Sequence, residues 1–375
     1  MKTRIKPATK LAKPILLACI SAALCSSLLA VSVQELASAK EDAALKERAA
    51  KLRADAIDYG LLPLPRSQKD ADLLIKSIRP DAIKYEASPE RIELGKQLYF
   101  DPRLSKSGII SCNTCHNLGL GGVDGVAAAV GHKWTPNPQH LNSPTVYNSA
   151  FNLVQFWDGR AAHLAEQAQG PIQAGPEMAA PKELIEERIA SIPGYVQGFA
   201  AAFGKEKKID FELIADTIAI FEHSLFTPAP FDDFLEGRDN ALSSLQQEGL
   251  ELFLDKGCAG CHNGVNLGGT MQGFELASKY EFASLGGFAG DKDGMVKAPT
   301  LRNVAETAPY FHNGGIWSLK DAVKAMGSVQ LGIKIEDAEA DKILAFLGSL
   351  TGAKPDVSYP QLPISSDATP KPDFN

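Results

Sequence analysis

The sequence predicts a mainly α-helical protein whose chain consists of two similar halves in tandem. The pattern C-x-x-C-H occurs at residues 112–116 and again at residues 258–262. Downstream of each copy, apolar residues recur three and four positions apart, which places their side chains on one face of a helix. A length of 375 residues is enough for two or three domains. Few segments alternate as strands do, so we expect little sheet.

Each C-x-x-C-H pattern is typical of the covalent attachment of a c-type haem. Two thiols add to the two vinyl groups of one haem, and the adjacent histidine supplies the proximal nitrogen to iron. A zinc site would place the cysteine pairs roughly 15–20 residues apart, whereas 142 residues separate Cys115 from Cys258. A thioredoxin-like motif or a disulfide framework does not predict the two histidines. The sequence therefore predicts two covalent haem c groups, held by Cys112, Cys115, His116, Cys258, Cys261 and His262.

The two halves also match outside these motifs. Residues 95–99 resemble residues 249–253, and residues 215–225 resemble residues 340–350. The order helix, haem motif, loop and terminal helix is that of a cytochrome c domain. Two prolines near residue 228 break helical structure and suggest the boundary. We expect a helical extension over residues 40–87, cytochrome c-type domains over 88–230 and 231–352, and an extended tail over 353–375.

Residues 1–39 are typical of an export signal. Five basic residues precede an uncharged, mostly apolar stretch over residues 14–33, and Ala37-Ser38-Ala39 follows, as at signal-peptidase sites. The pattern favours a cleaved signal peptide and a periplasmic protein. An uncleaved membrane anchor is the alternative, because the stretch approaches the ~20 residues that a membrane span needs.

Composition and net charge indicate which classes of binding partner to expect. Hydrophobic residues make up 45% and charged residues 22% of the chain, which is ordinary for a globular protein. The formal net charge is −7, and residues 1–39 carry five basic residues and one acidic residue, so cleavage would leave about −11. An acidic chain is not expected to bind nucleic acid. The charge favours a basic protein partner through electrostatic steering.

The sixth iron ligand distinguishes a haem that passes electrons from one that reacts. Met326 lies 64 residues after His262, late in the second half, where cytochromes c carry an axial methionine; a core methionine is the alternative. His132 lies 16 residues after His116 in a stretch rich in glycine and alanine. A flexible loop could therefore present this histidine to iron, and a surface histidine is the alternative.

Several further motifs make the chain similar to the bacterial dihaem cytochrome c peroxidases over about residues 50–350. MauG-type proteins share this architecture but are expected to carry tyrosine at the position of Met326, so the methionine favours the peroxidase branch. The motifs that carry the resemblance are Phe156-Trp157-Asp158-Gly159-Arg160, Gly175-Pro176-Glu177-Met178, Pro299-Thr300-Leu301-Arg302-Asn303, Thr307-Ala308-Pro309-Tyr310-Phe311-His312 and Met326-Gly327.

The resemblance implies a role for each haem and for the residues around it. The first haem would react with peroxide, with His132 as its removable sixth ligand, and the second would have a high potential with Met326 as its ligand. Trp157 would lie in the electron path between the haems. Glu177 would be the distal acid–base group, with Gln167 as its polar neighbour. A calcium ion between the domains would be bound by the Asn142 side chain and the backbone carbonyls of Thr307 and Pro309.

The resemblance also implies the reaction and its partners. It is the reduction of hydrogen peroxide to water, with electrons from a small periplasmic cytochrome c or a cupredoxin. Family members are often homodimers, although the sequence shows no dimer face. Two other functions stay open: a dihaem electron-transfer protein without peroxidase chemistry, and a MauG-like enzyme that oxidises a protein substrate.

Overall fold

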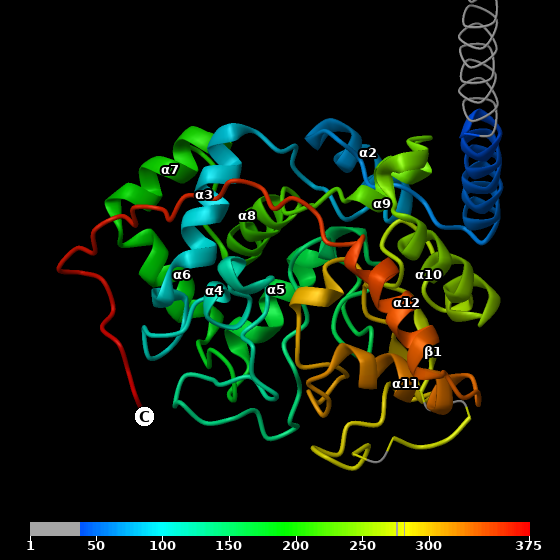
Figure 1. The fold of residues 1–375 in the computed structure, drawn as a ribbon. Coiled ribbons are helices and arrows are strands. Elements are labelled where there is room, and N and C mark those ends of the chain that lie inside the picture. Colours follow the sequence, from blue (N-terminus) through cyan, green and yellow to red (C-terminus); the bar gives the residue numbers. More distant parts are fainter. Residues whose placement is uncertain (1–37, 275–276, 281) are drawn as a thin grey trace, which may run out of the picture. The chain divides into compact units, whose positions relative to one another are not determined.

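The computed structural model describes residues 38–274, 277–280 and 282–375 (Figure 1). Most of the predicted export signal, residues 1–37, lies outside the described residues. Residues 53–375 form one compact unit, and the described residues before it are helical. No helix in the described ranges is long and apolar enough to cross a membrane.

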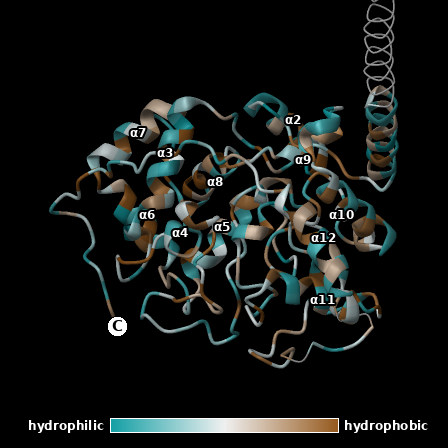
Figure 2. Ribbon diagram, in the orientation of Figure 1, coloured by the Kyte–Doolittle hydropathy of each residue, from teal (hydrophilic) through white to brown (hydrophobic). Residues whose placement is uncertain are grey.

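The first half is helical, with α8 at its centre. Helix α8 follows Asp210, whose carboxylate accepts the Leu213 N–H, and α3 follows Ser88, whose hydroxyl accepts the Arg91 N–H. Helix α8 is buried along most of its length, and Figure 2 shows its hydrophobic residues. The helices here are α2 (Gln68–Ile78), α3 (Pro89–Phe100), α4 (Cys112–Cys115), α5 (Leu164–Gln173), α6 (Lys182–Ala190), α7 (Pro193–Phe203) and α8 (Phe211–Glu222).

The second half contains a helix pair, α10 and α12, that corresponds to α3 and α8 of the first half. Ser243 caps α10 by accepting the Gln246 N–H, while the Gln246 side chain accepts the Ser243 N–H. Two short antiparallel strands pair with Met271 opposite Lys297, so the sheet content is as small as expected. The elements are α9 (Pro230–Leu235), α10 (Ser244–Asp255), β1 (Met271–Gly273), β2 (Met295–Lys297), α11 (Leu319–Gln330) and α12 (Asp337–Gly348).

One glycine in each half lets two helices cross closely. A Cβ at Gly95 of α3 would lie 2.2 Å from the Thr217 carbonyl oxygen of α8. A Cβ at Gly249 of α10 would lie 1.9 Å from the Lys342 carbonyl oxygen of α12. A real Cβ does not approach a backbone oxygen this closely, so each crossing requires glycine. The sequence repeat around these two glycines is therefore a repeat of one helix-packing geometry.

A buried ion pair joins the segment before α2 to the second half. Arg302 and Asp232 are both fully buried, with 2.8 Å between Nη2 and Oδ1. Arg302 also donates to the carbonyls of Leu62 and Val265, and Asp232 accepts the Leu64 N–H. Removing one partner of such a pair leaves an uncompensated charge and typically costs about 3–5 kcal/mol. The arginine of the Pro299–Asn303 motif is thus structural.

The C-terminal segment, residues 353–375, contains no helix or strand and runs along the first half (Figure 1). The buried Arg188 of α6 donates to the Lys371 carbonyl, and Ser191 donates to the Thr369 hydroxyl. Lys106 pairs with Asp373 at 3.2 Å. The extended tail is therefore fastened to the body of the protein by polar contacts along its length.

Candidate haem sites

Each C-x-x-C-H motif lines its own cavity. The space between the lining atoms is about 970 Å³ beside Cys115 and His116 and about 1230 Å³ beside Cys258, Cys261 and His262, open solvent included. Each motif therefore faces open space within the fold, where a cofactor could lie.

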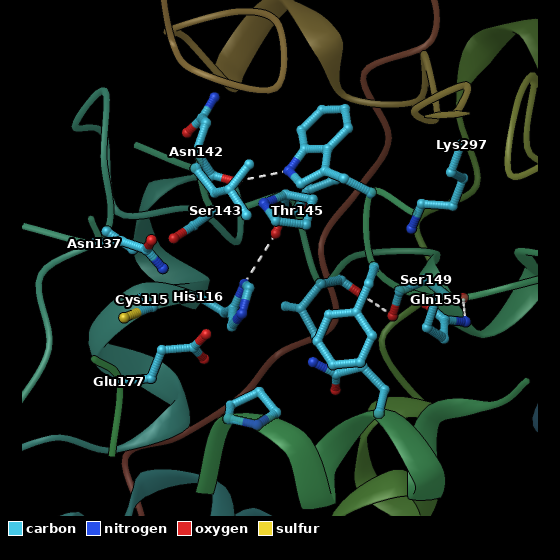
Figure 3. A pocket seen from close by; sticks show the side chains of 18 of the residues that line it. Cys115, His116, Asn137, Asn142, Ser143, Thr145, Ser149, Gln155, Glu177 and Lys297 are labelled. Atoms are coloured by element: carbon cyan, nitrogen blue, oxygen red, sulfur yellow. Dashed lines mark hydrogen bonds between the residues drawn. The ribbon is translucent and has the colours of Figure 1, made fainter. Parts of the chain in front are cut away.

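Both proximal histidines are oriented for metal binding. The His116 Nδ1 lies 2.9 Å from the Pro144 carbonyl oxygen, and the His262 Nδ1 lies 3.2 Å from the Leu267 carbonyl oxygen (Figure 3 shows His116). A carbonyl oxygen only accepts, so Nδ1 carries the proton and Nε2 is left to ligate iron. Burial lowers the pKa of both imidazoles. The neutral form that binds a metal is therefore favoured.

Cys112, Cys115, Cys258 and Cys261 form no disulfide among the described residues. Burial raises the pKa of all four thiols, to about 12 for Cys115 and about 11 for Cys258. Both cysteines and the histidine of the second motif line the second cavity, whereas Cys115 and His116 line the first. These groups are the attachment points of a covalent haem.

The Phe156–Arg160 motif forms a tight turn. Gln155 and Ala161 pair across it, and Phe156 (φ 65°) and Gly159 (φ 69°) take left-handed conformations. The turn points Trp157 inward, where its indole donates to the Asn142 carbonyl at 3.0 Å. Trp157 lines both cavities. The structure thus brings this residue between the two haem motifs.

Arg160 at the end of this turn, Gln167 and Glu177 are among the polar residues that line the first cavity. Gln167 lies on α5, and Glu177 follows its end, where the Glu177 N–H donates to the Ala174 carbonyl. Burial raises the pKa of the Glu177 carboxyl, while the positive charge of Arg160 acts against that rise. Arg160 stacks on the Phe156 ring, with 3.5 Å from its guanidinium carbon to the ring centre. A carboxyl with a raised pKa in a cavity is a candidate acid–base group.

The backbone of His132 lies beside the backbone of Glu177. Its backbone N–H donates to the Glu177 carbonyl at 2.7 Å, and its neighbour Gly131 lines the first cavity. The imidazole is 5% exposed, and its Nδ1 has no hydrogen-bond partner among the described residues. Burial is the main cause that lowers the pKa of this imidazole, and the charges of Lys133 and Lys106 lower it further. His132 itself is not among the residues that line the first cavity.

The second cavity has an aromatic wall. Met326 of α11 lines it together with Tyr280, Phe274 and Phe311. The Tyr280 hydroxyl donates to the Met326 sulfur at 3.9 Å. A thioether in an aromatic, largely apolar wall suits an axial ligand that favours ferrous iron. The structure thus brings Met326 to the same cavity as His262.

Two of the three predicted calcium ligands lie together. The Asn142 side-chain amide donates to the Pro309 carbonyl at 2.6 Å and to the Phe311 carbonyl at 3.3 Å. Thr307 lies two residues before Pro309 and is partly buried. The described residues contain no group of three or more histidine, cysteine, aspartate or glutamate side chains that could hold a metal. A cation here would depend on amide and carbonyl oxygens.

Sequence reasoning missed two charged residues that line the cavities. Lys297 lines both, and Glu222 lines the first. Each is an isolated charged residue within an otherwise apolar segment, which can equally well be a solvent-facing position. Only the packing of β2 and α8 puts them inside, and neither belongs to a motif.

Comparison with known proteins identifies the family. The family described as di-haem cytochrome c peroxidase matches residues 89–240, and the cytochrome c family matches residues 246–351. A cytochrome c551 peroxidase of Pseudomonas aeruginosa is 47% identical over 328 residues, which cover 82% of this chain and 94% of that protein. The chain belongs to the dihaem cytochrome c peroxidase family.

Other relatives agree with this assignment. A cytochrome c551 peroxidase of Nitrosomonas europaea is 45% identical over 79% of this chain and 89% of that protein. The methylamine utilization protein MauG of Methylorubrum extorquens is 33% identical over 79% and 90%. The crystal structure of a MauG-like protein associated with microbial copper homeostasis has a TM-score of 0.61 and 25% identity, and covers 71% of this chain and 90% of that one. The predictions of a mainly helical fold with two c-type haem domains, two haem c groups and a peroxidase are confirmed.

Proposed function

We propose that this dihaem peroxidase reduces hydrogen peroxide to water at the first cavity, with electrons that enter at the second. The observation that carries the proposal is the contrast between two cavities next to identical motifs. Glu177, Gln167 and Arg160 line the first, whereas Met326 and aromatic rings line the second. Acid–base groups suit peroxide chemistry, and a strong sixth ligand suits electron transfer.

Cys112, Cys115 and His116 would hold the reacting haem, and Cys258, Cys261, His262 and Met326 the other. When bound, a haem supplies the iron that ligates peroxide and exchanges electrons. Glu177 accepts the proton of one peroxide oxygen and returns it to the other, so that this oxygen leaves as water. Gln167 orients the peroxide by hydrogen bonding. Two electrons and two further protons complete the conversion of each peroxide into two waters.

Trp157 is the proposed link between the two sites. Its side chain is 9% exposed and lines both cavities. The indole contacts His312 edge to face, with ring centres 6.4 Å apart. A fixed, buried aromatic side chain shortens the gap that an electron crosses between the cavities.

His132 is the proposed removable ligand of the first iron. Its Nδ1 is buried without a partner among the described residues, so burial of the ring is not compensated by a hydrogen bond to Nδ1. A move of the loop toward the cavity would exchange the Glu177 carbonyl contact for an iron bond. Such a loop would expose or block the peroxide site according to the oxidation state.

Calcium is the proposed bridge between the two domains, 88–230 and 231–352. The candidate ligands are the Asn142 side-chain oxygen and the carbonyls of Thr307 and Pro309, with water completing the shell. Because these donors carry no charge, the site would bind calcium weakly. Treatment with a chelator should therefore remove the ion readily, with a measurable change in the spectrum of the first haem.

The electron donor is proposed to be a small basic cytochrome c or a cupredoxin in the periplasm, and the enzyme a homodimer. Cleavage after residue 39 would leave a charge of about −11, which steers a basic donor to the surface. The donor's association rate should fall as salt rises. Mass spectrometry of the exported protein tests the cleavage, and sedimentation tests the dimer.

One experiment tests the function against its alternatives. Half-reduced protein is mixed with hydrogen peroxide and reduced cytochrome c while spectra are recorded. The proposal predicts that peroxide is consumed with oxidation of two cytochromes per peroxide. A dihaem carrier would leave peroxide unreacted. A MauG-like oxidase would react with peroxide but would oxidise cytochrome c poorly.

A further inference from the structure

Lys297 is a buried cation between the two haem cavities. It is the last residue of β2, and its side chain is 4% exposed. Its backbone N–H donates to the Trp157 carbonyl at 2.7 Å. Its side chain lines both cavities and, in the first, points into the space between the drawn side chains (Figure 3). The lysine is therefore fixed to the residue that separates the two haem sites.

The ammonium group lacks a protein counter-ion. Among the described residues, no ion pair and no side-chain hydrogen bond involves this ammonium, and its side chain lines the cavities instead. Burial lowers the pKa of Lys297 to about 8, and the nearest acidic influence is Asp158. Asp158 is itself paired with Arg160 at 2.7 Å. A buried ammonium is rare unless it is paired, because desolvation of the charge is unfavourable.

A haem bound in each cavity would supply the missing anion. Haem c carries two propionate carboxylates, which are the anionic groups of an otherwise apolar ligand. Among the described residues that line the second cavity, Lys297 is the one lysine or arginine, and the first cavity adds Arg160. Arg160 is already occupied by Asp158 and by the Phe156 ring.

We propose that the Lys297 ammonium binds a propionate carboxylate of each haem, one from each cavity. The same positive charge then raises the reduction potentials of both haems. The pairing satisfies the buried charge and gives the two carboxylates a shared partner beside Trp157. A fixed cation stabilises the additional electron of a reduced haem. The inference rests on one haem per cavity, and its consequence for turnover rests on the proposed function.

The test replaces the charge and measures both haems. In Lys297→Met the length of the side chain is retained and the charge is lost. The reduction potential of each haem is measured by optical redox titration of the holoprotein, and resonance Raman reports the propionate bending modes. We expect both potentials to fall, so that the ratio of reduced to oxidised haem at a given potential drops about tenfold, equivalent to about 59 mV for one electron.

Three further variants make the result decisive. Lys297→Arg should restore most of both potentials, because it retains the charge. Lys297→Gln should shift both in the same direction as Lys297→Met, and it serves as the neutral variant if the methionine protein does not incorporate haem. Lys292→Met, on an 86% exposed side chain of the same segment, should change neither potential. A shift confined to one haem would overturn the shared pairing, and unchanged potentials and Raman bands would overturn any pairing.

The outcome is separable from that of the proposed function. Shifted potentials in a protein that does not reduce peroxide would support the pairing and contradict the proposed function. Unchanged potentials in an active peroxidase would contradict the pairing and leave the proposed function intact.

Discussion

The two haem cavities are built on the same helix pair but present opposite chemistry. Helices α3 and α8 pack together in the first half and α10 and α12 in the second, and both crossings depend on a glycine. Matched positions nevertheless differ. Glu222 of α8 lines the first cavity, and its counterpart Leu347 of α12 lines the second. The two halves thus share a scaffold, and differences within it and around it give each cavity its own lining.

The added residues come from different insertions. In the first half α5, α6 and α7 lie between the haem motif and α8, and Gln167 and Glu177 belong to that insertion. In the second half the same interval holds β1, β2 and α11, which bring Lys297 and Met326 to the cavity. Most of the side chains that distinguish the two cavities are therefore encoded in the part of each half that does not repeat.

The sharpest test of the difference is Glu177→Gln. Removing the proposed proton-transfer group should lower peroxide turnover about 10²–10⁴-fold, while the haem spectra stay unchanged because the amide occupies a similar volume. Steady-state kinetics with reduced cytochrome c measures the effect. Glu183→Gln, on an exposed side chain of α6, is the matched control. Turnover near that of the unmodified enzyme would remove Glu177 from the mechanism.

The second cavity is tested by Met326→Ala. Loss of the proposed thioether ligand should abolish the proposed high-potential couple, because thioether sulfur stabilises ferrous iron. A redox titration followed at the second haem measures this. Met295→Ala, on β2, changes a methionine of the same half and should leave the couple in place. If both variants titrate like the unmodified protein, another residue ligates the second iron.

The haem-binding parts could be predicted because covalent attachment leaves a local signature. Two thiols and a histidine must lie close together in sequence to reach one haem. The C-x-x-C-H pattern therefore predicts the roles of Cys112, Cys115 and His116 without a structure. The fold followed from the repeat around those motifs. The helix crossing at Gly95 and Gly249 was visible as a similarity, but its cause, contact with a backbone oxygen, needed the structure.

The remainder of the site depends on packing between distant segments. Lys297 and Glu222 lie in segments without a motif, and only the folded chain shows that they line a cavity. The predicted loop ligand His132 shows the converse limit. A glycine-rich sequence indicates that a histidine can move, but only the folded chain shows that His132 is buried, that its Nδ1 has no partner among the described residues, and that it does not line the cavity.

The carboxyl that distinguishes α8 from α12 gives a third test. Burial raises the pKa of Glu222 to about 8 from the ordinary 4.5, and its Oε2 has no hydrogen-bond partner in the described part of the chain. Its contribution to stability is fully present below pH 4.5 and is lost as pH rises toward 8, with a slope of at most about 1.4 kcal/mol per pH unit.

Glu222→Gln should therefore flatten the dependence of unfolding free energy on pH in this window and make the protein more stable than the unmodified enzyme above pH 8. Denaturant unfolding at several pH values measures it. Glu212→Gln, on the exposed first turn of the same helix, should retain the original pH dependence. A Glu222→Gln protein with the same slope would mean that the carboxyl titrates outside this range.

The smallest expected effect concerns the helix crossing that the two halves share. Gly249→Ala and Gly95→Ala should each reduce the unfolding free energy by about 1–3 kcal/mol, because the new methyl meets a backbone oxygen of the partner helix. Gly348→Ala, at the end of α12 with no atom within 4 Å of the added Cβ, should be neutral or slightly stabilising. Denaturant midpoints compare the three. If the cost at Gly249 equals that at Gly95, the two crossings are energetically equivalent, and the difference between the cavities does not come from how these helices cross. If only one substitution is tolerated, the helix pair itself has diverged, and the cavity beside the tolerant pair has room to adjust to its haem.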